Sequence, residues 1–86
     1  MSFRYSRHAL EEMTRRHIPQ PLVDNVLANP QQDVDTPDGK KAYQSQVDFG
    51  DGRIFLLRAI MAEDVLPNLV VTVYRTSKIS KYRRTP

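Results

Sequence analysis

The sequence predicts an α+β domain in which two N-terminal helices pack on a four-stranded antiparallel sheet. Apolar residues recur with helical spacing up to residue 28, whereas after Pro30 the spacing changes to the alternation that is typical of β-strands. Turn-forming Pro, Asp and Gly residues separate the strand segments. Because the helical segments precede the strands, we expect the helices to lie together on one face of the sheet.

The first helix is expected over residues 7–16. Ser6 can cap it, because the serine hydroxyl can accept a hydrogen bond from an amide of the first turn. One side of this helix is apolar, and His17 follows in the apolar stripe, where it either packs or ends the helix. The opposite side is polar and carries His8 and Arg15.

The second helix is expected over residues 20–28. Pro19 and Pro21 break the first helix and can open the second. Its apolar positions fall on one side, and Asn29-Pro30 ends it. The two helices are therefore expected to form a helical hairpin over residues 1–30.

The antiparallel sheet is expected in residues 31–77. Its turns are predicted at Pro37-Asp38-Gly39 and Gly50-Asp51-Gly52, which have strong turn chemistry. The four strands are predicted at residues 32–36, 41–49, 53–62 and 69–76.

The strand over residues 53–62 is expected at the centre of the sheet, because both of its faces are largely apolar. The face that we expect against the helices consists of Phe55, Leu57, Ala59 and Met61. The other face carries Arg58 between apolar neighbours. This arginine either extends to solvent over an open face or is held as a cation in a shallow cleft.

Length and composition restrict the class of protein. A chain of 86 residues has room for one small core, so residues 1–86 are expected to be a single domain. With no cysteine and two histidines, the chain has no disulfide, cysteine nucleophile or thiolate zinc site, and we expect neither a metal nor a cofactor. No segment has the pattern of a secretory signal or a membrane span, so we expect a cytoplasmic protein without membrane contacts.

The charge is unevenly distributed along the chain. The formal net charge is +3, but both ends are basic and the middle is acidic. Residues 75–86 hold five basic side chains and no acidic one, and residues 78–86 are interpreted as a basic tail. This pattern fits an anionic partner such as RNA, although a basic tail can also be merely solvated.

A cluster of hydrogen-bond donors follows the last predicted strand. It consists of Arg75, Thr76, Ser77 and Lys78. A forked cation, two hydroxyls and an ammonium group can together hold a phosphate, and Tyr74 and Tyr82 could stack on bases. The alternative is structural: Thr76 and Ser77 end the strand, Tyr74 is part of the core and the lysines keep an edge soluble.

Two segments of this chain, Tyr5 to Pro30 and Val70 to Tyr82, resemble a bacterial family catalogued as a domain of unknown function (number 4258). The matching positions are His8, Ala9, Leu10, Met13, Arg16 and Ile18, then Val73, Tyr74, Arg75, Thr76, Ser77 and Lys78. The chain departs from the family pattern at Glu12, where members often have Arg, and at His17, where they often have a small or turn-forming residue. The family is itself similar, more remotely, to the RelE/BrnT-like ribonuclease toxins, whose fold agrees with the order of elements predicted above.

The resemblance implies a site for RNA cleavage without a metal. In RelE-like toxins the ribose 2′-hydroxyl attacks the adjacent phosphate, and Arg58, Arg75 and Tyr82 resemble their catalytic side chains in type and order. His8 belongs to the family signature, lies on a polar face and is a candidate general base for the 2′-hydroxyl. The candidate RNA-binding residues are Arg15, Arg75, Thr76, Ser77, Lys78, Lys81, Arg83 and Arg84.

Two functions follow as hypotheses. The first is a metal-independent ribonuclease toxin or toxin-like RNA-binding protein, neutralised by a small acidic antitoxin-like protein that covers the basic cleft. The alternative is a non-catalytic accessory or interaction domain that uses the apolar second face of the sheet for binding.

Overall fold

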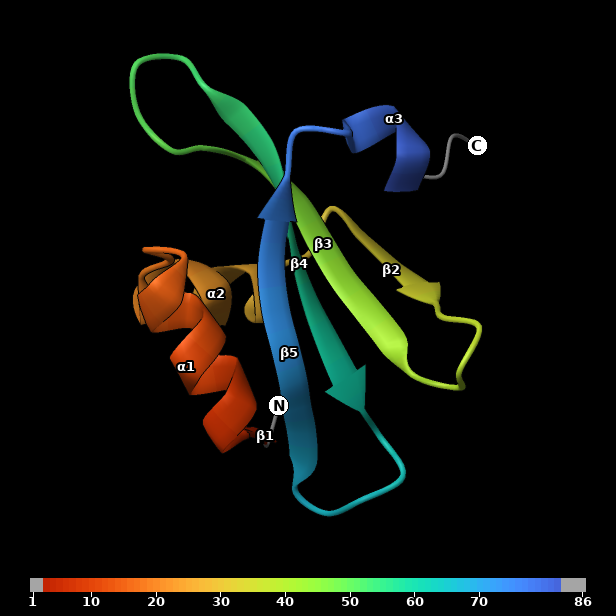
Figure 1. Ribbon diagram of the computed structural model, residues 1–86. Coiled ribbons are helices and arrows are strands. Elements are labelled where there is room, and N and C mark those ends of the chain that lie inside the picture. Colours follow the sequence, from red (N-terminus) through yellow and green to blue (C-terminus); the bar gives the residue numbers. More distant parts are fainter. Residues whose placement is uncertain (1–2, 83–86) are drawn as a thin grey trace.

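A computed structural model describes residues 3–82 and shows an α+β fold with a single sheet. Figure 1 shows α1 and α2 together on one side of the sheet and α3 on the other. The helices are α1 (Arg7–Arg15), α2 (Gln20–Ala28) and α3 (Ile79–Tyr82), and the strands are β1 (Phe3–Tyr5), β2 (Gln32–Asp35), β3 (Lys41–Asp48), β4 (Ile54–Ala62) and β5 (Asn68–Thr76).

The sheet corrects the prediction of four antiparallel strands. It has five strands in the order β1-β5-β4-β3-β2, and β1 pairs with β5 in parallel, so the sheet is mixed. The four predicted strands are present, and they pair antiparallel as β2–β3, β3–β4 and β4–β5. The extra strand has only 3 residues, too few to display an alternating pattern, and its partner lies at the other end of the chain.

The two N-terminal helices agree with their predicted bounds to within one residue. The Ser6 hydroxyl accepts a hydrogen bond from the amide of Ala9 at 3.0 Å and donates one to the carbonyl of Val71 at 3.1 Å. Ser6 therefore caps α1 and ties its first turn to β5.

The end of α1 explains His17. His17 has a φ of 55°, its amide donates to the carbonyl of Thr14, and the amide of Ile18 donates to the carbonyl of Met13. This pair of hydrogen bonds with a left-handed residue is the Schellman motif, in which glycine is the usual occupant. His17 is exposed and Ile18 is buried. Of the two roles predicted for His17, helix termination is confirmed and packing is wrong.

The core lies between the two helices and one face of β4. The predicted facing of β4 is confirmed, because Leu57, Ala59 and Met61 are fully buried in one cluster with side chains of both helices. The contributions of the helices are Ala9, Met13, Val23, Val26 and Leu27. Phe55 precedes Leu57 on the same face of β4, and its ring meets that of Phe49 edge to face.

The second face of the sheet is partly covered by the C-terminal segment. After β5 the chain turns back, and α3 lies over the face that α1 and α2 leave open (Figure 1). Leu56 belongs to this second face, and it is buried. Residues 79–82, expected to be part of a basic tail, are thus a short helix packed on the sheet.

Candidate functional site

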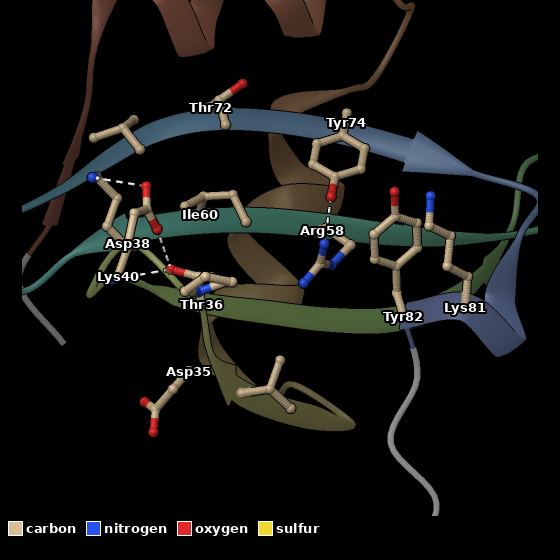
Figure 2. Close-up of a pocket in the computed structure, with 13 residues that line it drawn as sticks. Asp35, Thr36, Asp38, Lys40, Arg58, Ile60, Thr72, Tyr74, Lys81 and Tyr82 are labelled. Atoms are coloured by element: carbon tan, nitrogen blue, oxygen red, sulfur yellow. Dashed lines mark hydrogen bonds and ion pairs between the residues drawn. The ribbon is translucent and has the colours of Figure 1, made fainter.

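A hollow of about 470 Å³ lies on the second face of the sheet, opposite the two N-terminal helices. It is formed by β2, the β2–β3 turn, the middle of β4 and β5, and α3 (Figure 2). Arg58, Tyr74, Lys81 and Tyr82 line one end of it. The size lies within the range of small-ligand pockets in proteins.

Arg58 is held in this hollow by the strands on both sides of it. In the register of the sheet Arg58 lies opposite Gln44 of β3 and opposite Tyr74 of β5. Its Nε donates to Gln44 Oε1 at 2.8 Å, and its Nη1 donates to the hydroxyl of Tyr74. The arginine is only 9% exposed. Of the two interpretations of Arg58, the structure agrees with a cation held in a cleft and not with a side chain that extends to solvent.

Tyr82 of α3 covers the guanidinium from the solvent side. The guanidinium carbon lies 4.5 Å from the centre of the Tyr82 ring and 5.6 Å from that of Tyr74, a cation–π arrangement on two aromatic faces. Gln44 Nε2 donates to the Tyr82 carbonyl at 3.2 Å, so the same amide that orients Arg58 also holds α3. Lys81 adds a second cation, with its Nζ 5.2 Å from the Tyr82 ring.

The positive charge of Arg58 has no carboxylate partner within residues 3–82. The ion pairs of this part of the chain involve other side chains. A buried charge without a counter-ion is unfavourable unless hydrogen bonds or a ligand compensate it. Here neutral acceptors and ring faces supply that compensation, and they leave the net charge in place to attract an anion.

The other end of the hollow carries a local pair of opposite charges. Asp38 accepts a hydrogen bond from the Thr36 hydroxyl at 2.5 Å and forms an ion pair with Lys40 at 3.2 Å. These contacts hold the pKa of Asp38 below its usual range. Figure 2 shows the Asp35 carboxylate directed away from Arg58. The cationic character of the hollow is therefore concentrated around Arg58 and Lys81.

A β-bulge gives the hollow its apolar floor. The β4–β5 register shifts between Ile60 and Met61, so that Val71 is an extra residue in β5. Val71 and Thr72 both line the hollow, together with Ile60, while the flanking Val70 and Val73 are buried against the helices. The bulge thus turns one additional apolar side chain toward the site.

The predicted site residues are divided between the two faces. Arg58, Tyr82 and Lys81 are brought together in the hollow. Arg75 lies opposite Leu57 and so faces the helix side, where its guanidinium carbon is 4.4 Å from the ring of Phe49.

The remaining predicted residues lie outside the hollow. His8 is exposed on α1, which packs on the other face, so it is not brought near Tyr82. Arg15 is held by Glu12 at 2.6 Å. The Thr76 hydroxyl accepts from the amide of Lys78 at 3.0 Å, which is the strand-ending role, and Ser77 and Lys78 are exposed. Arg83 and Arg84 lie outside the described residues.

Gln44 was not predicted as a site residue. It is 1% exposed and links β2, Arg58 and α3 through its side-chain amide. A polar residue in the middle of a predicted strand is a weak signal by itself. The role of Gln44 depends on the β3–β4 register, which sets it opposite Arg58.

The fold and the hollow define a small α+β domain with a cationic site on the sheet face that its first two helices leave open. The chain belongs to the family described as Domain of unknown function (DUF4258), whose sequence model matches residues 5–75. No curated protein and no solved structure gives a significant match to the chain. The predicted family is confirmed, and the remoter kinship with RelE/BrnT-like toxins stays a prediction.

Two further observations concern residues 3–82. None of the helices in this part of the chain combines the length and the apolar character required to cross a lipid bilayer. Within the same residues, no group of three or more His, Cys, Asp or Glu side chains is placed to hold a metal ion.

Proposed function

We propose that this protein is a toxin-like RNA-binding protein that cleaves RNA without a metal, with its site in the hollow around Arg58. The observation that carries the proposal is a buried arginine at the edge of an open hollow, without a carboxylate partner within residues 3–82. A preorganised guanidinium of this kind suits a phosphate diester, because the N–H groups that Gln44 and Tyr74 leave unused can donate to phosphate oxygens.

The surroundings of Arg58 supply the other contacts that single-stranded RNA requires. Lys81 can neutralise a second phosphate, and the Tyr74 and Tyr82 rings lie edge to face with their centres 6.3 Å apart. Aromatic side chains stack on unpaired bases, and Ile60 and Val71 form an apolar floor on which a base can also lie. The hollow therefore suits one nucleotide and its flanking phosphate.

The reaction that fits this site is an internal transfer within the RNA. The ribose 2′-hydroxyl gives its proton to water as its oxygen attacks the neighbouring phosphorus. The bond from phosphorus to the 5′-oxygen breaks, and the products carry a 2′,3′-cyclic phosphate and a 5′-hydroxyl. Arg58 stabilises the charge that develops on the phosphate oxygens. The Tyr82 hydroxyl makes no hydrogen bond to another residue of the described chain, so it is free to give the leaving oxygen its proton.

The proposal includes a protein partner that covers the same cations. A small acidic protein seated on the hollow would place a carboxylate on Arg58 and exclude RNA, which is how an antitoxin-like partner would neutralise the activity. The alternative, a non-catalytic interaction domain, is favoured by the apolar part of the hollow lining at Val34, Ile60 and Val71. In that case the hollow would bind a protein segment and no RNA.

The test is incubation of the purified protein with a fluorescent single-stranded RNA, with and without EDTA. We expect binding and cleavage in both conditions, with 2′,3′-cyclic phosphate ends detected by mass spectrometry. Arg58→Gln is expected to abolish cleavage and weaken binding. Arg53→Gln is the matched control, because Arg53 is an exposed arginine in the β3–β4 turn and does not line the hollow.

A variant at the surface tests the proposal even if Arg58→Gln does not fold. Lys81 is exposed, so Lys81→Gln should keep the fold and lower the slope of log affinity against log salt by about 0.7. If the protein binds RNA without cleaving it, the RNA-binding part of the proposal stands and the nuclease part is overturned. An absence of RNA binding by the folded protein would overturn both in favour of the interaction domain.

A further inference from the structure

Arg75 forms a second cationic feature on the helix side of the sheet. Its guanidinium carbon lies 4.4 Å from the centre of the Phe49 ring and 4.8 Å from that of Phe55, and the two rings meet edge to face at 5.6 Å. All three side chains are half-buried. The rings fix the guanidinium in place, because a cation is attracted to the face of an aromatic ring.

The guanidinium of Arg75 has unused hydrogen-bonding capacity. No hydrogen bond or ion pair joins it to another side chain within residues 3–82, so the donors of its planar fork are available to a ligand. Arg75 is only half-buried, so a ligand can approach it from solvent. Unpaired RNA bases stack on such guanidinium planes.

The edge of β5 beside Arg75 carries no further strand in the described part of the chain. β1 pairs with β5 only at its beginning, and the last pair is Tyr5 with Val70. Residues 72–76 therefore form a free edge, and Figure 1 shows the end of β5 extending beyond α1 and α2. Tyr74 of the hollow and Arg75 are consecutive residues on this edge, and they point to opposite faces of the sheet.

We propose that the RNA strand bound at Arg58 crosses the free edge of β5 and places a second phosphate on Arg75. This inference rests on the proposed function and adds to it a binding site several nucleotides long that spans both faces of the sheet. The side chains of Arg58 and Arg75 start on adjacent strands with one residue of offset, so roughly 6 Å separates their Cα atoms. A flexible single strand can cover the longer path around the edge, whereas a rigid duplex cannot.

The side chains around Arg75 favour RNA over a protein partner, because they combine cations with aromatic rings. Ser77 and Lys78, which follow shortly after Arg75 in the chain, are exposed, and so is Lys81 beside the hollow. A series of separated cations with aromatic rings between them is how proteins bind single-stranded nucleic acid without a deep groove. An acidic protein surface could meet these cations, but it would leave the aromatic rings and the guanidinium plane without the bases that stack on them.

The test compares short and long RNA on the same variants. Fluorescence anisotropy is measured with a dinucleotide and a ten-nucleotide oligouridine over a range of salt concentrations. Arg75→Gln is expected to lower the affinity for the ten-nucleotide RNA roughly tenfold and its salt slope by about 0.7, and to leave dinucleotide binding unchanged. Arg75→Met keeps the apolar packing against the phenylalanines, so this variant should stay folded. If it loses affinity as Arg75→Gln does, the loss comes from the missing charge and not from misfolding.

The controls separate this inference from the proposed function. Arg53→Gln should match the parent on both RNAs, and Lys81→Gln should weaken both. Equal affinity of the parent and both Arg75 variants for the long RNA would overturn the inference and leave the hollow as the RNA site. Failure of the parent to bind either RNA would overturn the proposed function itself, and with it the inference.

Discussion

Arg58 and Arg75 lie on neighbouring strands but face opposite sides of the sheet. Arg58 is paired with Tyr74, and Arg75 is paired with Leu57 of the buried row. Arg58 therefore contributes to the hollow, whereas Arg75 stacks on Phe49 and Phe55 on the helix side. The two arginines therefore do not clamp one phosphate between them, and the proposed chemistry is assigned to Arg58 alone.

This division predicts different outcomes for the same conservative change at the two positions. Arg58→Lys keeps the charge but loses the fork that donates to Gln44 and Tyr74, so we expect the single-turnover cleavage rate to fall by about 10²- to 10³-fold. Arg75→Lys, at saturating RNA, should cleave at the rate of the parent. Thermal melts check that both variants are folded. An equal loss of cleavage rate in the two variants would instead place both residues at the scissile phosphate.

The core predicts a large contrast between two leucines. Leu57 is fully buried against the helices, and Leu57→Ala is expected to lower the free energy of unfolding by about 2 to 5 kcal/mol. Leu66, in the β4–β5 loop, is 95% exposed, so Leu66→Ala should change it by less than about 0.5 kcal/mol. Urea denaturation measures both, and a loss below about 0.5 kcal/mol for Leu57→Ala would contradict the assignment of this face.

The end of α1 offers a stabilising change. His17 has a left-handed backbone in a position that glycine usually occupies, and glycine adopts this conformation without strain. His17→Gly is expected to raise the free energy of unfolding by about 0.5 to 1 kcal/mol. Glu11→Gly, at an exposed position inside the same helix, is the control and should lower it by about 1 kcal/mol. Destabilisation by His17→Gly would mean that the imidazole makes contacts that outweigh the strain.

Glu12 predicts a dependence of stability on pH. Hydrogen bonds from Arg15 and Arg16 lower the pKa of Glu12 to about 2. Since the pKa is lower in the folded than in the unfolded state, the stabilisation is complete above about pH 5 and is lost as the pH falls toward 2. Glu12→Gln should therefore show a smaller loss of melting temperature between pH 5 and 2 than the parent. Glu11→Gln, which changes an exposed residue without an ion pair in the described chain, should follow the parent curve.

The sequence was sufficient for the features that depend on local pattern. The bounds of α1 and α2 follow from capping at Ser6 and from the prolines, and the facing of β4 follows from its wholly apolar row. Both depend on residues close together in the chain, and the burial of apolar side chains is the dominant favourable contribution to folding.

The features that were missed depend on pairing between distant segments. β1 is a strand through its pairing with β5, and α3 lies over the sheet, where Gln44 donates to the carbonyl of Tyr82. Whether Arg58 and Arg75 share a face depends on the β4–β5 register, which no local pattern fixes. The composition of the site was thus predictable in part, through Arg58, Tyr82 and Lys81, but its assembly was not.

Tyr82 has two separable roles in the proposed site, and the variants Tyr82→Phe and Tyr82→Ala distinguish them. The ring covers the Arg58 guanidinium, while the hydroxyl is the group proposed to protonate the leaving oxygen. Phenylalanine keeps the ring and removes the proton, so we expect Tyr82→Phe to bind RNA as the parent does and to cleave it about 10²- to 10⁴-fold more slowly. Alanine removes both, so Tyr82→Ala should also lose affinity. Single-turnover rates and anisotropy on the same RNA measure the two effects. Parental cleavage by Tyr82→Phe would exclude the hydroxyl as the proton donor, because no other part of the side chain can supply that proton.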